Sequence, residues 1–192
     1  AATSGILWHP ETHYDMVRAG IGMYGLSPDP SVASAQELGL TPVMTLSAPL
    51  TSVKVIEEGT PASYGGTWQA PSRRWVGLVP LGYGDGILRA ASNGAPVAVE
   101  TDSGLVKAQI VGRICMDQFI IDLGPAEGRE GTATQNSGNA PAQVGDRAIL
   151  FGDPAKGYPI ADEWAAHAGT INYEVITRLG ERIPRQYVNE EE

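Results

Sequence analysis

The segment GRICMDQFIID, residues 112–122, contains the only cysteine of the chain. Arg113, Cys115 and Asp117 occupy every second position there, a spacing that places side chains on one face of a strand. A cation, a thiol and a carboxylate on one face could form a nucleophile with its helpers, or only the polar side of an ordinary strand. A Cys–His nucleophile needs a histidine beside the thiol, and the sequence around Cys115 offers none. We therefore predict a strand over 112–122 and leave the role of its polar row open.

Two tyrosines stand in positions that could serve chemistry. Tyr64 in SYGGTW precedes a Gly-Gly turn, where a side chain can project from the end of a strand. Tyr173 in TINYEVI lies near the start of a predicted helix, where outward-pointing backbone N–H groups favour an anion. Either could instead be half-buried with its hydroxyl hydrogen bonded. A tyrosine that acts as a base needs nearby positive charge or hydrogen-bond donors, which Arg113 or Arg89 could supply.

Metal and nucleotide chemistry have little support. His9, His13 and His167 do not combine with the single cysteine in a spacing typical of zinc ligands, so we expect no metal site. GYGDG, residues 82–86, lacks the Lys-Ser/Thr pair of a phosphate-binding loop. We predict a tight turn there, after the strand WVGLVPL, with glycines supplying positive φ.

Composition restricts the partners. The 192 residues, 42% of them hydrophobic, are enough for one real core. A net charge of -9 with scattered Lys and Arg argues against nucleic acid as a partner. No apolar run approaches the ~20 residues of a membrane span, so we expect no membrane association. One cysteine excludes an internal disulfide framework and fits a reducing compartment, so we expect a cytoplasmic protein.

The elements that would position these residues are mostly strands separated by Gly/Pro turns. The strand-like stretches are 44–56, 75–84, 95–101, 105–124 and 146–152. Two helices are predicted near the end, over 161–167 and 170–179, with Gly169 and Gly180 at their C-terminal ends. Residues 9–26 indicate a connector with a short helical turn and then a Gly-rich, strand-like run. Residues 125–146 indicate a hairpin insertion rich in small residues.

Six motifs occur in an order and spacing that resembles the C-terminal part of alanine racemases. They are YDMVRAGIGMYGL, SYGGTW, PLGYGDGILR, IVGRICMDQ, GTINYEV and RIPRQY. The resemblance extends from about Thr3 to Tyr187 and leaves out only 125–146. In that family a (β/α)8 barrel carries pyridoxal 5'-phosphate on a lysine and a β-domain follows. Each active site of the head-to-tail homodimer combines one subunit's barrel with the other subunit's β-domain.

The resemblance implies a mainly β chain. Residues 1–30 would be the last strand-loop segments of the barrel, and 31–192 a C-terminal β-barrel or sandwich domain with short C-terminal helices. The chain's three lysines (Lys54, Lys107 and Lys156) match no cofactor lysine, so that residue would lie outside the chain. We therefore expect the isolated chain to be inactive.

The resemblance also implies residues that hold the cofactor. Arg18 matches the arginine that faces the pyridine nitrogen. The groups matched to the cofactor phosphate are the backbone N–H groups of Gly20 and Ile21 and the hydroxyls of Thr3 and Tyr173. The family usually has Asn-Ser where this chain has Ala2-Thr3, a departure that still retains a hydroxyl.

Tyr64 matches the catalytic tyrosine of the family, which removes the α-proton of the L-enantiomer while the lysine serves the other face. Two-base racemisation needs a proton acceptor on each face of the α-carbon. The residues matched to the substrate entry corridor are Tyr83, Arg89, Arg113, Asp117 and Ile171, and the Met116 N–H matches a group near the substrate carboxylate. By the same resemblance Cys115 becomes a packing neighbour of the tyrosine.

The function implied is interconversion of L- and D-alanine, supplying D-alanine for peptidoglycan. The implied partners are a small amino-acid substrate and the barrel domains of the same and of a second subunit. Three alternatives remain: a broad-specificity or serine racemase of the same architecture, a non-catalytic dimerisation β-domain, and a Cys115-dependent hydrolase. The related decarboxylases place a cysteine, in a different motif, where this chain has Tyr64.

Overall fold

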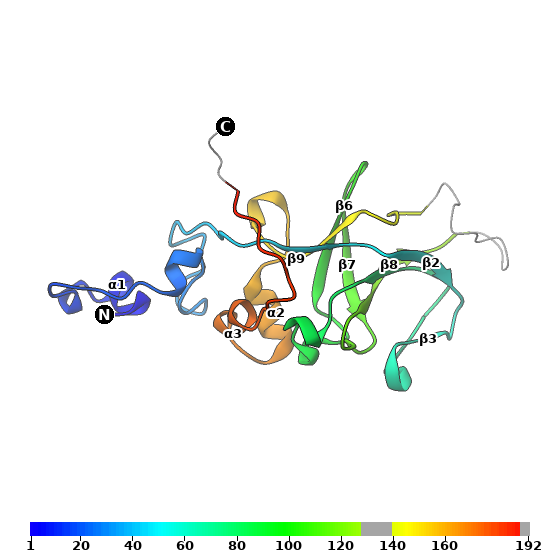
Figure 1. The fold of residues 1–192 in the computed structure, drawn as a ribbon, viewed down its shortest axis with the longest axis horizontal. Coiled ribbons are helices and arrows are strands. Elements are labelled where there is room, and N and C mark those ends of the chain that lie inside the picture. Colours follow the sequence, from blue (N-terminus) through cyan, green and yellow to red (C-terminus); the bar gives the residue numbers. More distant parts are fainter. Residues whose placement is uncertain (128–139, 189–192) are drawn as a thin grey trace.

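A computed structural model describes residues 1–127 and 140–188 of the chain, and an antiparallel sheet of seven strands dominates it (Figure 1). Its strand order is β1-β9-β6-β7-β8-β5-β2, and the sheet curls into a half-barrel. The strands of this sheet are β1 (Leu46–Pro49), β2 (Ser52–Ile56), β5 (Arg74–Val79), β6 (Pro96–Thr101), β7 (Gly104–Val111), β8 (Phe119–Pro125) and β9 (Arg147–Phe151). A separate hairpin pairs β3 (Pro61–Ala62) with β4 (Trp68–Gln69). The predicted mainly β fold is confirmed.

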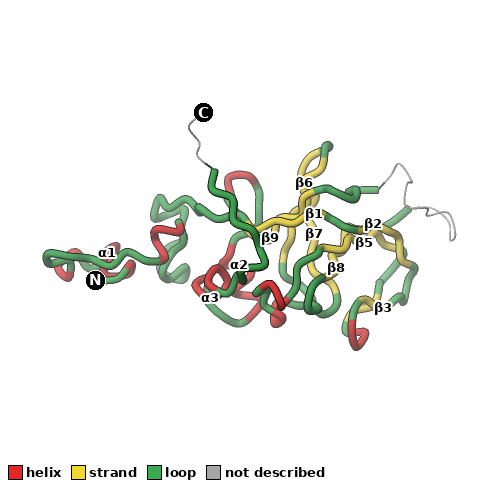
Figure 2. Tube along the Cα trace, in the orientation of Figure 1, coloured by secondary structure: helices red, strands yellow, loops and turns green. Residues whose placement is uncertain are grey.

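Helices in the described residues are few and short (Figure 2). The α-helices are α1 (Thr3–Trp8), α2 (Ala161–Ala168) and α3 (Asn172–Thr177). Single turns of 3-10 helix are η1 (Pro10–Thr12), η2 (Ile21–Tyr24), η3 (Tyr64–Gly66), η4 (Tyr83–Asp85), η5 (Arg89–Ala91) and η6 (Pro154–Lys156). None of the described helices is long and apolar enough to cross a membrane.

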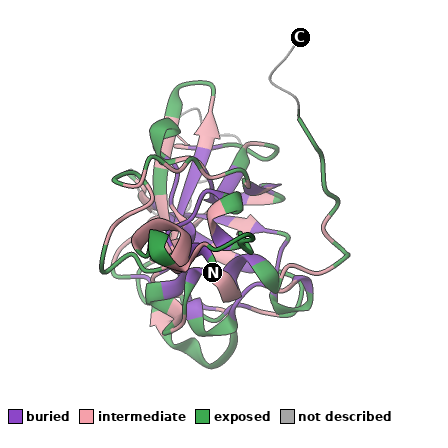
Figure 3. Cartoon of the chain, turned by 90° about the vertical axis from the view of Figure 1, so that its left-hand side faces the viewer, coloured by how far each residue is buried: buried purple, intermediate pink, exposed green. Residues whose placement is uncertain are grey.

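Alternation of β-branched residues fixes the centre of the sheet. In β6, Val97 and Val99 are buried in the main core, while Ala98 points to a second cluster with Ile149 and Tyr158. The strand is covered on both faces, and strands of this kind tolerate apolar residues at every position. Figure 3 shows that buried residues follow the strands, whereas the C-terminal segment is exposed or of intermediate burial.

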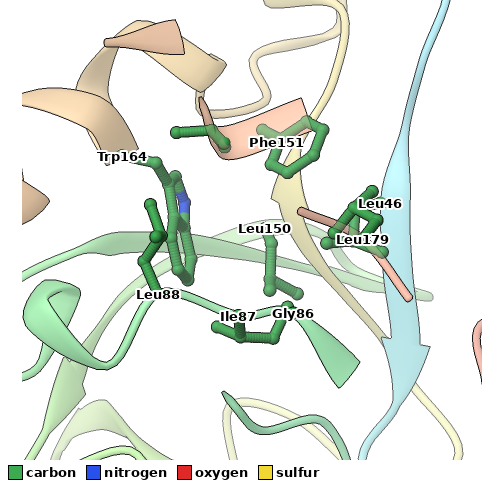
Figure 4. Close-up of a pocket in the computed structure, with 9 residues that line it drawn as sticks. Leu46, Gly86, Ile87, Leu88, Leu150, Phe151, Trp164 and Leu179 are labelled. Carbon is green, nitrogen blue, oxygen red and sulfur yellow. The ribbon is translucent and has the colours of Figure 1, made fainter. Parts of the chain in front are cut away.

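Trp164 of α2 anchors the helices to the sheet. Its indole N–H donates to the carbonyl of Pro96 at 3.0 Å, and its side chain is 2% exposed. Figure 4 shows it beside Leu88 in the space between α2 and the sheet. The hollow among these side chains measures about 10 Å³, room for no more than one water, so it is core rather than a ligand site.

The strand predicted over 112–122 is wrong in its first half. β7 ends before Gly112, and β8 begins only after Gln118. Gly112 adopts a left-handed φ of 72°, which breaks the strand, and the Cys115 N–H donates to the Gln118 carbonyl at 2.9 Å. The seven residues 112–118 therefore form a loop, and their side chains do not alternate between two faces of a sheet.

The N-terminal segment also differs from its prediction. The Gly-rich run within 9–26 forms the 3-10 turn η2 instead of a strand. The turn ends at Gly25, whose φ is 72° and whose backbone lies so close to Thr41 that a Cβ would come within 1.7 Å of the Thr41 carbonyl oxygen. This segment extends from the sheet toward one end of the molecule's long axis (Figure 1).

The C-terminal helices were predicted with the right order. α2 ends at Gly169, which has a left-handed φ of 67° as expected for a helix stop. α3 is shorter than predicted, and Gly180 lies beyond its end, where its N–H donates to the Asp85 carbonyl at 2.8 Å. The predicted insertion at 125–146 falls partly on residues 128–139, which lie outside the described residues.

Candidate active site

Tyr64 opens the turn between β3 and β4, and its side chain is 73% exposed. Gly65 and Gly66 follow with φ values of 75° and 54°, so the predicted Gly-Gly turn is confirmed. The Arg113 guanidinium packs against this turn, because a Cβ added at Gly65 would lie 3.4 Å from Arg113 Cζ. A cation therefore lies beside the backbone that carries Tyr64.

Ser63 holds an unusual backbone conformation immediately before Tyr64. Its φ of 60° and ψ of -170° fall in a region that is essentially restricted to glycine and costs about 1–3 kcal/mol. Its hydroxyl donates to the Arg113 carbonyl at 2.6 Å and lies 3.2 Å from the Cys115 sulfur. These contacts attach the turn Tyr64–Gly66, called the tyrosine turn below, to the loop 112–118.

A hollow of about 270 Å³ opens beside the contact between Ser63 and Cys115. It is lined by Ser63, Tyr64, Cys115, Gln118, Phe119 and Ile120. No histidine of the described residues is hydrogen bonded to Cys115, whose sulfur forms hydrogen bonds with the Ser63 hydroxyl and, at 3.7 Å, with the Arg113 carbonyl. A thiol in this setting lacks the base that a cysteine nucleophile needs.

Asn93 and Ser92 attach the loop 112–118 to the η5 turn. The Gly112 N–H donates to Asn93 Oδ1 at 2.7 Å, and the Ile114 N–H donates to Ser92 Oγ at 3.0 Å. Asn93 also donates through Nδ2 to Thr67 Oγ1 at 3.1 Å, at the far end of the tyrosine turn. The Asn93 side chain thus connects the segment after η5 with both the loop 112–118 and the tyrosine turn.

The η4 turn docks on the same loop from the other side. The Tyr83 N–H donates to the Cys115 carbonyl at 3.0 Å, and the Gly84 N–H donates to the Met116 carbonyl at 2.8 Å. Gly82 allows this approach, because a Cβ there would come within 2.3 Å of both carbonyl oxygens. The structure therefore brings together Tyr83 and Met116, which were predicted on separate motifs. The Met116 N–H has no acceptor within the described residues.

Arg182 binds both η4 and the loop 112–118, a role that was not predicted. Its guanidinium forms ion pairs with Asp117 at 2.6 Å and with the buried Asp85 at 3.2 Å. A hydrogen bond to Asp117, then the charge of Asp85, raises the pKa of Arg182. The residue lies in the RIPRQY motif, but 65 positions separate it from Asp117, so local spacing held no signal.

A second group of predicted residues lies in the N-terminal segment. Thr3 is buried, and its hydroxyl oxygen accepts hydrogen bonds from the N–H groups of Gly20 at 3.2 Å and Gly22 at 3.4 Å. Ile21 is 4% exposed, yet its N–H has no acceptor within the described residues. Arg18 is exposed, and its backbone N–H donates to the Ala1 carbonyl at 2.7 Å.

Tyr173 of α3 packs against the main core cluster, to which Ile21 belongs. Burial raises the pKa of Tyr173. The remaining predicted residues, Arg89 in η5 and Ile171 before α3, are exposed. Among the described residues, no hydrogen bond joins either side chain to the Tyr64 turn. The described part of the chain also holds no group of three or more side chains able to bind a metal ion.

The two groups lie at opposite ends of the molecule. Figure 1, drawn with the long axis horizontal, places the segment with α1 at one end and the hairpin with β3 at the other. The seven-stranded sheet lies between them, and within one copy of the chain the structure does not bring Tyr64 together with Thr3 or Arg18.

Comparison with known proteins decides the family. The model of the alanine racemase C-terminal domain matches residues 43–187, and that of the alanine racemase N-terminal domain matches residues 1–28. The chain belongs to the alanine racemase family. The alanine racemase of Streptomyces coelicolor is 46% identical over 94% of this chain, and that of Beutenbergia cavernae is 45% identical over 98%. The chain spans less than half the length of these relatives, 42% and 45% respectively.

Solved structures of alanine racemases agree with this assignment. The Streptomyces coelicolor enzyme superposes with a TM-score of 0.85 at 44% identity, over 99% of this chain and 45% of that one. The Bacillus anthracis enzyme, whose structure contains bound L-Ala-P, gives a TM-score of 0.78 at 31% identity, over all of this chain and 45% of that one.

Proposed function

We propose that this chain is the C-terminal part of a pyridoxal-phosphate-dependent alanine racemase, which interconverts L- and D-alanine as a homodimer in the cytoplasm and supplies D-alanine for peptidoglycan. One observation carries the proposal beyond family membership. The N-terminal segment, which carries Thr3 and Arg18, and the hairpin of β3, which carries Tyr64, lie at opposite ends of the molecule. A site shared between two subunits accounts for this separation.

The N-terminal group has the chemistry to hold a phosphate. The Thr3 hydroxyl accepts from the N–H groups of Gly20 and Gly22, and between them the N–H of Ile21 has no acceptor among the described residues. Anions bind well where backbone N–H groups converge. Gly20 leaves open space, because a Cβ there would contact only Thr3, at 3.9 Å. We infer that these groups, with the Tyr173 hydroxyl, hold the cofactor phosphate.

When bound, pyridoxal phosphate supplies an electron-withdrawing ring that makes the α-proton of the amino acid acidic. Arg18 would face the ring nitrogen, and an arginine, which stays protonated, leaves that nitrogen without a proton. The exposed Arg18 side chain is available for this contact. The lysine that holds the cofactor lies outside this chain, so we expect the isolated chain to lack activity.

Tyr64 would accept the α-proton of L-alanine in the partner subunit's site. Its exposed ring projects from a turn fixed by the loop 112–118, and the Arg113 guanidinium lies against that turn. The N–H of Met116, which has no acceptor in the part of the chain that the structure describes, is suited to a substrate carboxylate. Tyr83, Arg89, Arg113, Asp117 and Ile171 would line the entry to the site.

A chimera tests the proposal. The part of the Streptomyces coelicolor enzyme that precedes the matched region would be joined to this chain, and alanine racemisation would be measured with pyridoxal phosphate present. We expect activity that falls by about 10²–10⁴-fold in Tyr64→Phe, the contribution typical of a general base. Tyr187→Phe, which changes a 90% exposed tyrosine with no predicted role, is the matched control.

The alternatives predict other results. A chimera that dimerises and binds the cofactor but racemises nothing would favour a non-catalytic dimerisation domain. Faster turnover of serine or several amino acids than of alanine would favour a serine or broad-specificity racemase. Full activity in Tyr64→Phe would remove Tyr64 as the base.

A further inference from the structure

We propose that Ser63 is a positioning residue, which fixes the direction of Tyr64 by holding a strained backbone conformation with its hydroxyl. The proposal deepens the function proposed above and rests on it. Strain of this kind persists only when the surrounding structure over-determines it, and it is found most often at functional sites. Here the strained residue directly precedes the exposed tyrosine.

The choice of residue at position 63 is informative. Glycine would adopt φ of 60° and ψ of -170° without strain, and the same turn already contains Gly65 and Gly66. A third glycine would leave the backbone around Tyr64 with few restraints. Serine keeps a Cβ and a hydroxyl there, and the hydroxyl is the group that bonds across to the neighbouring loop.

The hydroxyl has one proton, which it donates to the Arg113 carbonyl at 2.6 Å. The Cys115 sulfur lies 3.2 Å from the same oxygen and 3.7 Å from the Arg113 carbonyl, and its one S–H proton can be donated to either acceptor. Both partners belong to the loop 112–118, so the hydroxyl couples the tyrosine turn to the loop that also carries Met116. This gives Cys115 a supporting role in place of a nucleophilic one.

Close packing behind Ser63 adds to the restraint. A Cβ at Gly112 would come within 2.5 Å of the Ala62 carbonyl oxygen and 2.9 Å of Ser63 Cβ. The Gly112 backbone is in turn held by Asn93. The backbone before Tyr64 therefore cannot shift toward the loop, and the Ser63 hydroxyl prevents it from moving away.

Positioning matters because a base must reach within hydrogen-bond distance of the proton that it removes. A displacement of about 1 Å at a reacting group can cost about a hundredfold in rate. The Tyr64 side chain is mostly exposed in this chain, so its own packing fixes it poorly. Within this chain, restraint on Tyr64 comes through the backbone of its neighbour, Ser63.

The test compares variants of the chimera described above. Ser63→Ala removes the hydroxyl and keeps the Cβ, Ser63→Gly removes the hydroxyl and the strain, and Ser63→Thr retains a hydroxyl. We expect kcat to fall about ten- to a hundredfold in the alanine and glycine variants, with KM little changed. The threonine variant should recover much of the rate. Thr101→Val is the matched control, because it removes a hydroxyl-to-carbonyl bond of 2.8 Å in the β6–β7 turn.

An isotope measurement separates positioning from general damage. Tyr64 would remove the α-proton of L-alanine only, so α-deuterated L-alanine should show a larger isotope effect in Ser63→Ala than in the unchanged chimera. The effect with α-deuterated D-alanine should not increase. Unchanged rates and isotope effects in both Ser63→Ala and Ser63→Gly would overturn the proposal, as would equal increases with both enantiomers.

The two proposals fail in different ways. If Tyr64→Phe abolishes racemisation while Ser63→Ala and Ser63→Gly are as active as Thr101→Val, only the role of Ser63 is wrong. If Tyr64→Phe is fully active, Tyr64 is not the base and the role of Ser63 falls with it. Should Ser63→Ala fail to fold, Ser63→Gly, which relieves the strain, gives the same comparison.

Discussion

The Asn93 side-chain oxygen accepts a hydrogen bond of 2.7 Å from the Gly112 N–H, joining two loops that are 19 positions apart. Gly112 is buried, so no water replaces this acceptor. Asn93 itself has a left-handed φ of 57°, which asparagine tolerates better than most residues. The same side chain reaches Thr67, and it thereby holds the loop 112–118 and the tyrosine turn in one arrangement.

Replacing Asn93 should destabilise the chain in graded steps. Asn93→Gly keeps the backbone conformation and leaves the Gly112 N–H without a partner, a loss of about 1–3 kcal/mol in the free energy of unfolding. Asn93→Ala should lose a further ~1–2 kcal/mol in the free energy of unfolding, because alanine is strained at this left-handed φ. Asn93→Asp keeps an acceptor and should be the mildest. Urea unfolding of the three variants measures this order, and equal stability of all three would contradict it.

Gly82→Ala should destabilise the chain by steric conflict alone. The φ of Gly82 is -152°, which any residue can adopt, but a Cβ would lie 2.3 Å from the carbonyl oxygens of Cys115 and Met116. Backbone atoms cannot yield as a flexible side chain does, so we expect a loss of about 1–3 kcal/mol or more.

Gly59→Ala provides the control for this clash. Gly59 has a φ of 75° with nothing within 4 Å of the added Cβ, so this variant reports backbone strain without steric conflict. Thermal unfolding of both variants separates the two effects. A Gly82→Ala variant as stable as the unchanged chain would mean that η4 and the loop 112–118 pack less closely than described.

Predictions from the sequence succeeded where local patterns decide structure. The strand-like stretch 95–101 between Gly/Pro turns predicted a strand, and glycines 65 and 66 predicted a turn. The rule of alternation failed for residues 112–118, because polar residues at every second position resemble a strand while Gly112 and a side chain from another loop dictate a turn. The role of Arg182 also depends on partners distant in sequence, so no local pattern revealed it.

Acid should weaken the chain partly through Glu100. A hydrogen bond from Arg147 at 2.6 Å, helped by one from the Tyr158 hydroxyl, lowers the pKa of Glu100 below its ordinary 4.5. Because the folded-state pKa is the lower one, this carboxylate stabilises the fold above about pH 4.5. The stabilisation is lost as the pH falls through the folded-state value.

Melting temperatures of Glu100→Gln and of the unchanged chain, measured from pH 7 to pH 3, test this linkage. The melting temperatures of Glu100→Gln and the unchanged chain should differ most at pH 7 and become similar toward pH 3. Glu58→Gln removes an exposed carboxylate that forms no ion pair within the described residues, and it should leave the pH dependence unchanged. A constant difference between Glu100→Gln and the unchanged chain at every pH would contradict the linkage.

Thr3 offers a test of the cofactor site that does not depend on activity. Its hydroxyl oxygen accepts from Gly20 and Gly22, and its methyl group packs so closely on Gly22 that a Cβ there would approach it to 2.9 Å. Thr3→Val keeps this shape and removes the hydroxyl, whereas Thr3→Ser keeps the hydroxyl. Because hydrogen bonds to charged groups contribute about 1.5–3 kcal/mol, we expect Thr3→Val to bind pyridoxal phosphate about ten- to a hundredfold more weakly in the chimera.

Absorbance titrations of the chimera with pyridoxal phosphate and with pyridoxal give the measurement. Pyridoxal lacks the phosphate, so its affinity should be the same in Thr3→Val and Thr3→Ser, and only pyridoxal phosphate should separate them. The comparison bears on the departure at this position, where Thr3 replaces the serine usual in the family. If the valine variant binds pyridoxal phosphate as tightly as the serine variant, the hydroxyl does not contact the phosphate, and the N–H groups of Gly20 and Ile21 must hold it without Thr3.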